Sequence, residues 1–411
     1  MKTELDSLMQ SRQLDAVLVL GSGQHNPPMV YLTGGAHFSQ ALLVKKRGSD
    51  PVLFCRSMER DEAAKSGLHL RNIEDYPFDK FLHQHQGNAI AATAEFYSCM
   101  LAEAGVTRGR IAVYGQMDSG QSYAILSALQ TALPEITLVG ELGDTLMLTA
   151  MATKEKDEIE RIRRMGQITT QVVGKTADFL SSQHAKNHTL VGKDNEPITI
   201  GKVKKLIKLW LAELGADSPH GLIFAQGRDA GVPHSTGNDL ALLKMGETIV
   251  FDIYPCEPGG GYFYDLTRTW CLGYASDQVL ALYEDVHTVY TKIMDELEAG
   301  AHCARYQERT CQLFQDMGHP TIKENPATQN GYVHGLGHGV GLNLHERPFF
   351  RLTSDQNERL DPNVVVTVEP GLYYPERRMG VRLEDTVWMR PDGQKEILAP
   401  YSLDLILPLR K

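Results

Sequence analysis

Two segments of the sequence each combine strand-forming residues, a turn signal of prolines and glycines, and a pair of carboxylates. The first segment carries Asp252 and Asp265, and the second carries Glu369 and Glu384. β-Branched and aromatic runs on both sides of such a turn signal are typical of β-hairpins. Residues that face each other across an even-numbered loop differ by an odd number, as both pairs do. The sequence therefore predicts that Asp252 faces Asp265, that Glu369 faces Glu384, and that two hairpins present four carboxylates.

Four buried carboxylates repel one another unless a cation neutralises them. Oxygen ligands and an imidazole suit a divalent ion of hard to borderline character, such as manganese, iron, cobalt or zinc. Carboxylates also bridge two such ions at a separation of about 3.5–4 Å. The two hairpins therefore indicate a metal site.

A glycine-rich run between the hairpins holds the three histidines His334, His338 and His345. Glycines let the backbone adopt unusual dihedral angles and approach a ligand closely, so these imidazoles can converge on one point. Taken alone, the run fits a glycine-rich turn with surface histidines equally well. It is not a dinucleotide-binding loop, because no βαβ context surrounds it. His345 and Glu346 also lack the second histidine of the zincin motif.

The composition is that of an ordinary globular protein and argues against several classes of function. The length of 411 residues, with 42% hydrophobic and 22% charged residues, suggests about two domains. A net charge of −10 without a basic stripe argues against nucleic acid as a partner. The N-terminus lacks the apolar core of a signal peptide, and no stretch approaches the roughly 20 apolar residues of a membrane span. We therefore expect a cytoplasmic protein with no membrane partner, and its six scattered cysteines argue against a disulfide framework.

The chain divides into two predicted domains of the α/β (α+β) class. Residues 1–150 alternate strand-like and helical runs, as α/β domains do. From Met151 a charge-rich segment leads into apolar residues at helical spacing, which predicts an amphipathic helix at the start of a second domain, residues 151–411. Other expected elements are strands at 16–21, 41–44, 51–55 and 110–114, helices at 56–66, 119–131, 201–214 and 276–300, and a loop at 181–200.

The order Asp, Asp, His, Glu, Glu resembles the metal-ligand set of the pita-bread metallopeptidases, which include methionine aminopeptidase, aminopeptidase P, prolidase and creatinase. The ligands fall on Asp252, Asp265, His338, Glu369 and Glu384. Three sequences that flank these ligands also resemble the family: Asp-Leu-Thr-Arg-Thr, Val-Glu-Pro-Gly-Leu-Tyr and Gly-Val-Arg-Leu-Glu-Asp. The N-terminal 150 residues resemble the domain that precedes the catalytic domain in prolidase and creatinase. The resemblance therefore implies a pita-bread catalytic domain of the prolidase and aminopeptidase P branch, in a homodimer whose N-terminal domain covers the active site.

The sequence departs from the family pattern in three places. Ile253-Tyr254-Pro255 follows Asp252 where the family usually has a glycine, and the loop to Asp265 is longer than the commonest form. Leu344 stands where Ile or Val is usual. No ligand is lost, but we expect the first two departures to reshape the pocket beside the metal site.

The chemistry that the resemblance implies is hydrolysis of the Xaa-Pro bond in dipeptides or short peptides. Two divalent ions per chain would activate the attacking water, with manganese expected first and cobalt, zinc or iron as alternatives. Glu369 would accept the proton in addition to ligating metal. His234 and His345 would donate hydrogen bonds to the developing oxyanion or to the scissile peptide.

Further residues would bind the substrate. His334 would contact it, and an apolar proline pocket would draw on Phe349, Phe350, Tyr373 and Tyr374. Arg382 lies two residues before Glu384, and this spacing places both on one face of a strand. Arg382 would therefore order Asp252 or bind a substrate carboxylate, with a purely structural ion pair as the alternative.

Two other classes of function stay open. The first is a non-peptidase enzyme on the same fold, either a creatinase-like C–N hydrolase or a metal-dependent lyase acting on a small molecule. The departure at Ile253-Tyr254-Pro255 keeps the lyase or an unusual substrate open, whereas the complete ligand set argues against the creatinase-like branch, since creatinase has lost ligands and works without metal. The second is a binding protein without catalysis, which the complete ligand set argues against.

Overall fold

The computed structural model describes residues 4–353 and 357–409, which form two compact units. One comprises the residues up to Met151 together with Gly259–Gly261, and the other comprises Ala152–Pro258 and the residues from Tyr262 onward. Both units mix helices and strands, which confirms the expected α/β (α+β) class. None of the described helices combines the length and the apolar character that a bilayer span requires.

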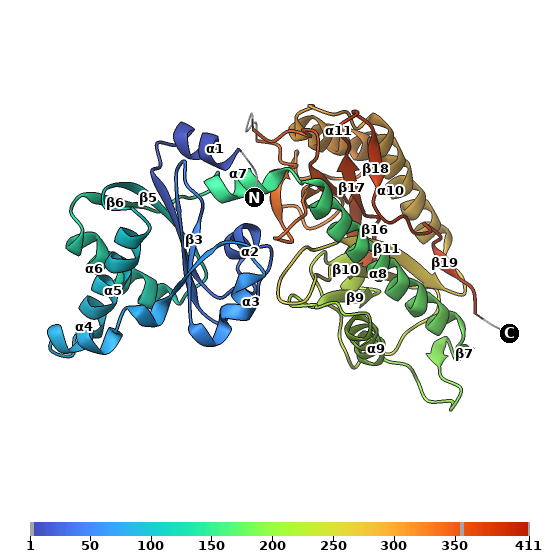
Figure 1. The fold of residues 1–411 in the computed structure, drawn as a ribbon. Helices are drawn as coiled ribbons and strands as arrows, with labels where there is room; N and C mark the ends of the chain where they lie inside the picture. The colour runs from blue at the N-terminus through green and yellow to red at the C-terminus, as the bar shows by residue number, and fades with distance from the viewer. Residues whose placement is uncertain (1–3, 354–356, 410–411) are drawn as a thin grey trace. The chain divides into compact units, whose positions relative to one another are not determined.

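The first unit is a six-stranded sheet flanked by helices (Figure 1). Its strands are β1 (Ala16–Gly21), β2 (Ala41–Lys46), β3 (Val52–Cys55), β4 (His69–Asn72), β5 (Gly109–Gly115) and β6 (Ile136–Val139), and its helices are α1 (Leu5–Ser11), α2 (Pro27–Thr33), α3 (Arg60–Ala64), α4 (Phe78–Gln84), α5 (Ala89–Glu103), α6 (Ser119–Ala132) and α7 (Leu146–Ala152). The strand order is β4-β3-β2-β1-β5-β6. β1 is parallel to β5 and antiparallel to β2. Helices α5 and α6 pack together and contribute to the core against the sheet.

The predicted strands of this unit are confirmed, and the predicted helix at 119–131 is α6. The predicted helix at 56–66 is wrong in extent, because a 3₁₀ turn at Ser57–Glu59 precedes the five-residue helix α3. Helix α5 has no counterpart among the expected elements. Its apolar side chains are spread around the helix, so the sequence there lacks a clear helical period.

The second unit contains long helices around two main sheets. Its helices are α8 (Lys156–Ser181), α9 (Ile200–Glu213), α10 (Asp277–Glu296) and α11 (Cys303–Asp316). Its strands are β7 (His184–Lys186), β8 (Thr189–Val191), β9 (Leu222–Gln226), β10 (Thr248–Ile253), β11 (Leu266–Leu272), β12 (His338–Gly339), β13 (Glu346–Phe349), β14 (Val365–Val368), β15 (Gly371–Tyr374), β16 (Met379–Arg382), β17 (Asp385–Met389), β18 (Lys395–Ile397) and β19 (Ile406–Leu407). One sheet has the order β19-β11-β10-β9 and the other β13-β12-β14-β17-β18, while β15 and β16 form a separate hairpin.

The amphipathic helix predicted after Met151 is α8, whose first turn is closed by a capping box between Glu155 and Glu158. The loop predicted at 181–200 is wrong, because this segment contains the hairpin of β7 and β8. Asn187 and His188 form its two-residue turn with φ angles of 50° and 57°. Two successive positive φ values match a type I′ turn, which the flanking polar residues do not reveal in the sequence.

Candidate active site

Strands β10 and β11 bring the first two carboxylates to a cavity in the second unit. In their antiparallel register Asp252 faces Thr267 rather than Asp265. The predicted direct opposition of Asp252 and Asp265 is therefore wrong by two residues, because the connection from Tyr254 to Asp265 is too long for a tight hairpin turn. Alternate residues of a strand share a face. Asp265 thus points to the same side as Thr267 and still reaches the side that Asp252 occupies.

The second pair of carboxylates flanks the hairpin of β15 and β16. Its register pairs Gly371 with Arg382, which gives Glu369 and Glu384 opposed positions just beyond the strand ends, as predicted. The backbone N–H of Glu384 donates to the carbonyl oxygen of Thr267 over 3.1 Å, and the Thr267 hydroxyl donates to Glu384 Oε2 over 2.6 Å. Thr267 therefore joins the two hairpins and brings their carboxylates together.

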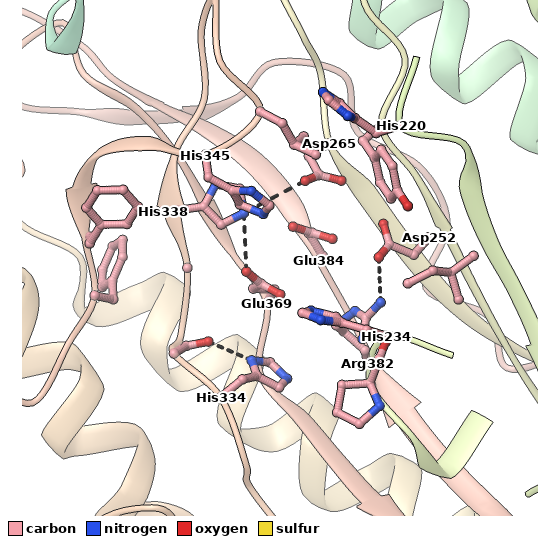
Figure 2. A pocket seen from close by; sticks show the side chains of 18 of the residues that line it. His220, His234, Asp252, Asp265, His334, His338, His345, Glu369, Arg382 and Glu384 are labelled. Carbon is pink, nitrogen blue, oxygen red and sulfur yellow. Dashed lines mark hydrogen bonds and ion pairs between the residues drawn. The ribbon is translucent and has the colours of Figure 1, made fainter. Parts of the chain in front are cut away.

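His338 completes the cluster from β12. Its Nε2 lies 3.5 Å from Glu369 Oε1 and 3.8 Å from Asp265 Oδ2 (Figure 2). Its Nδ1 lies 3.1 Å from the carbonyl oxygen of Gly339, which fixes the ring and leaves Nε2 for the cluster. Ligand atoms of Asp265, His338 and Glu384 all lie within 4.8 Å of one another. The imidazole of His338 and the carboxylates of Asp265, Glu369 and Glu384 therefore lie around a common point.

The carboxylate oxygens outnumber the hydrogen-bond donors around them. In the described part of the chain, Asp252 Oδ1, Asp265 Oδ1 and Glu384 Oε1 are buried without a hydrogen-bond partner. Burial, and then repulsion from neighbouring carboxylates, raises the pKa of Asp265 and Glu369 well above the usual values and that of Glu384 to about 8. Burial also lowers the pKa of His338 to about 3, so its imidazole is neutral. Unpaired carboxylate oxygens beside a neutral imidazole suit a divalent cation.

Arg382 connects the cluster to the glycine-rich histidine run. Its Nη2 donates to Asp252 Oδ2 over 2.5 Å, and its Nη1 donates to Tyr373 Oη over 2.8 Å. The contact with Asp252 that was expected of Arg382 is therefore present, and it fits both the ordering role and a structural ion pair. Tyr373 Oη lies 2.8 Å from His334 Nε2, and His334 Nδ1 lies 2.7 Å from the carbonyl oxygen of Gly335. Both ring nitrogens of His334 are thus engaged within the protein, which leaves the carbon face of the ring toward the cavity.

A cavity of about 670 Å³ opens at the cluster. It is lined by all five expected metal ligands and by His234, His334, His345, Phe349, Phe350 and Arg382. The rings of His338 and His345 pack edge to face with centroids 4.3 Å apart. Burial, and then the neighbouring His234, lowers the pKa of His345. A neutral imidazole beside the cluster can still donate one hydrogen bond.

The expected aromatic wall is only partly present. Phe349 and Phe350 line the cavity, whereas Tyr373 and Tyr374 are not among its described lining residues. The hydroxyl of Tyr374 lies 2.6 Å from His319 Nδ1, and its ring belongs to the hydrophobic core. Adjacent residues of a strand point to opposite faces, which explains why Tyr374 turns away from Tyr373.

Sequence reasoning missed several lining residues, including His220, Ile223 and Arg351. His220 stacks on Phe263 with ring centroids 5.6 Å apart, and no motif in its neighbourhood signals this position. Tyr254 also lines the cavity. Its position in the segment where the family usually has a glycine is the sequence signal that points to it. Burial, and then the charges of Asp252 and Asp265, raises the pKa of Tyr254.

Comparison with known proteins follows the same division of the chain. Residues 160–391 match the model of metallopeptidase family M24, and residues 2–146 match the creatinase/prolidase N-terminal domain. A Xaa-Pro dipeptidase of Pyrococcus furiosus is 27% identical over 245 residues, which cover 59% of this chain and 62% of that protein. A Xaa-Pro dipeptidase of Pyrococcus horikoshii is 23% identical over 390 residues, covering 95% and 94%. The crystal structure of a dipeptidase from Pyrococcus horikoshii OT3 superimposes with a TM-score of 0.75 at 20% identity, covering 98% of both chains.

Proposed function

Because this chain belongs to metallopeptidase family M24, we propose that it hydrolyses the Xaa-Pro bond of dipeptides or short peptides. The observation that carries the proposal is the complete set of Asp252, Asp265, His338, Glu369 and Glu384 around one cavity, with three buried carboxylate oxygens left unpaired. An Xaa-Pro bond has no N–H to recognise. The phenyl rings of Phe349 and Phe350 offer the apolar surface that a proline ring requires.

These five residues would hold two divalent ions per chain, with manganese proposed first and cobalt, zinc or iron as alternatives. The donor set supports this assignment, because carboxylates and one imidazole suit such ions. When bound, the ions would polarise the scissile carbonyl and lower the pKa of the attacking water. All other steps fall to side chains of this protein.

Glu369 is proposed as the proton acceptor. Its Oε1 lies 3.5 Å from His338 Nε2, and burial, followed by repulsion from Glu384, raises its pKa, which favours proton uptake. His345 and His234 line the cavity beside the cluster and would donate hydrogen bonds to the oxyanion or to the peptide. Arg382 holds Asp252 in place, and the ring of His334 would contact the substrate.

The test is a substrate panel on chelator-treated protein reconstituted with manganese, cobalt or zinc. Xaa-Pro dipeptides and Xaa-Pro-Yaa tripeptides should be cleaved, while Xaa-Ala controls should be poor substrates. Protein that binds two ions and cleaves no Xaa-Pro peptide contradicts the proposal. That result would favour the second candidate, a C–N hydrolase or lyase acting on a small molecule, for which Tyr254 in the cavity is the supporting observation.

We also propose a homodimer formed through the N-terminal domain, residues 1–150, with residues 151–411 as the catalytic domain. Light scattering at micromolar concentration should give twice the chain mass of 45.7 kDa, and a monomer would contradict this. The six cysteines are unpaired, as in proteins of a reducing compartment, which supports a cytoplasmic location.

A further inference from the structure

The N-terminal unit contains a second cavity, of about 940 Å³, that shares no lining residue with the active-site cavity. It lies where strands β1, β3, β4 and β5 end, because Ser22, Arg56, Ile73 and Gln116 follow these strands and line it. Open α/β sheets bind ligands outside the carboxyl ends of strands, where the strand order reverses. In the order β4-β3-β2-β1-β5-β6 this point lies between β1 and β5. The topology therefore places the cavity at the usual ligand position of such a sheet.

Two glycines bring the ends of β1 and β5 close together at this point. Gly21 and Gly115 have φ angles of +112° and +121°. A Cβ on Gly21 would lie 2.6 Å from the carbonyl oxygen of Gln116, and one on Gly115 would lie 2.0 Å from that of Leu20. Only glycine tolerates both the backbone conformation and the contact. The backbones therefore meet, and side chains from the surrounding helices form the walls.

Aromatic side chains form one wall of the cavity. Tyr76, Phe78, Phe96 and Tyr97 line it. The ring centroid of Phe96 lies 6.3, 5.7 and 6.1 Å from those of Tyr76, Phe78 and Tyr97. Such clusters bind flat rings in edge-to-face or offset contacts, and their faces attract cations. The wall thus suits a small aromatic group.

The charged side chains that line the cavity favour a cation over an anion. The lining contains one cation, Arg56, and three carboxylates, Glu74, Asp79 and Asp118. Glu74 Oε2 accepts from the backbone N–H and the hydroxyl of Ser57, and Asp118 Oδ1 accepts the backbone N–H of Gln121 over 2.9 Å. Asp118 thereby caps the N-terminus of α6 and places a negative charge where helices otherwise attract anions. The carboxylate of Asp79, an exposed residue in the first turn of α4, has no hydrogen bond or ion pair with the described residues, so it is open to a ligand at the mouth of the cavity.

We propose that this cavity binds a small aromatic amine. The ring lies against the aromatic wall, and the ammonium group pairs with Asp79. The volume is within the range of about 300–1,000 Å³ that is common for small-molecule sites. An aromatic acid should bind more weakly, because three carboxylates line the cavity with a single cation, Arg56.

Calorimetric titration of the full chain tests the proposal with three probes. Tryptamine should bind, while 3-indolepropionate, which replaces the amine by a carboxylate, and n-hexylamine, which lacks the ring, should bind roughly tenfold more weakly or worse. Asp79→Asn should weaken tryptamine binding by roughly tenfold. Thr93→Trp, which fills the cavity from α5, should abolish it. Glu135→Gln removes an exposed carboxylate elsewhere in the same unit and is the matched control.

Equal affinity for the three probes overturns the proposal, as does tryptamine binding that survives in both folded cavity variants. Folded full-length protein that binds no tryptamine also overturns it. Comparing tryptamine with the dipeptide Trp-Gly distinguishes a free amine from a peptide N-terminus, and preference for either supports the aromatic-amine chemistry. Glu369→Gln should leave tryptamine binding unchanged, because the two cavities share no residue.

Discussion

The ammonium group of Lys154 and the carboxylate of Glu346 form an ion pair in which the two side chains are 1% and 0% exposed. Glu346 directly follows His345, and its Oε2 accepts the backbone N–H of Asn343 over 3.2 Å. A Cβ at Gly341 would lie 2.3 Å from Glu346 Oε1, so the carboxylate is packed tightly inside the turn. The ion pair therefore holds the turn that carries His345 to the active-site cavity.

Glu346→Ala should destabilise the protein strongly, because it leaves the Lys154 ammonium buried and unpaired. The free energy of unfolding should fall by roughly 3–5 kcal/mol, measured by urea denaturation. The double variant Lys154→Met/Glu346→Leu should be more stable than Glu346→Ala, since it removes both charges. Glu298→Ala disrupts an exposed pair with Arg305 and should leave the midpoint nearly unchanged. Equal stability of Glu346→Ala and Glu298→Ala would show that the pair has no structural role.

Asp265→Asn should reduce the metal content and the peptidase activity together. The substitution removes an anionic oxygen from the tightest part of the cluster, where ligand atoms of Asp265, His338 and Glu384 lie within 4.8 Å of one another. Elemental analysis of manganese-reconstituted protein should approach two ions per chain for the unmodified sequence and clearly fewer for the variant. Full metal content in the variant would remove Asp265 from the ligand set.

Glu369→Gln should separate turnover from metal binding. Glutamine keeps the size and one coordinating oxygen but loses the basicity, so metal should be partly retained. The rate should fall by about 10²–10⁴-fold, the usual contribution of a general base. Single-turnover rate and metal content should both be measured on the same preparation of the variant and compared with those of the unmodified protein. Near-normal turnover with both ions bound would mean that another group accepts the proton.

His234→Ala should leave the metal content intact and weaken the rate on Xaa-Pro substrates. His234 lines the active-site cavity but belongs to neither carboxylate hairpin. Its loss should therefore remove a substrate contact and no metal ligand. Steady-state kinetics beside elemental analysis separate these effects, and a variant that loses its metal would place His234 among the ligands.

The stability of metal-free protein should fall as pH rises from about 6.5 to about 8. Burial raises the pKa of Glu384 from 4.5 to about 8, so the stability linked to its proton is full below pH 4.5 and is lost as pH rises through about 8. Burial lowers the pKa of His334 and His338 from 6.5 to about 3, so stability linked to these neutral rings is present above pH 6.5 and lost as pH falls through about 3. Above pH 6.5 the contribution of the histidines is constant, so the pH dependence of the stability is set by the carboxylates.

Melting temperatures of chelator-treated protein across this window check the prediction. Manganese should remove the trend, because ligated carboxylates are already ionised at pH 6.5. A melting temperature that rises between pH 6.5 and 8 without metal would contradict the raised pKa of Glu384.

The sequence by itself determined the two hairpins, the amphipathic helix α8, the α/β class and the family. Hydrophobic periodicity, turn residues and motif spacing are local properties of the chain, so they can be recognised in the sequence alone. It also predicted the opposed positions of Glu369 and Glu384, because the turn between them is short.

Only the tertiary structure decided which residues meet across long separations. The register of β10 and β11 sets Asp252 against Thr267, and a bridge from Glu384 to Thr267 joins two hairpins more than a hundred residues apart. The buried pair of Lys154 and Glu346 leaves no local pattern, because its partners are 192 residues apart. Strand pairing and side-chain packing fix such contacts, and both depend on the whole chain rather than on any window of its sequence.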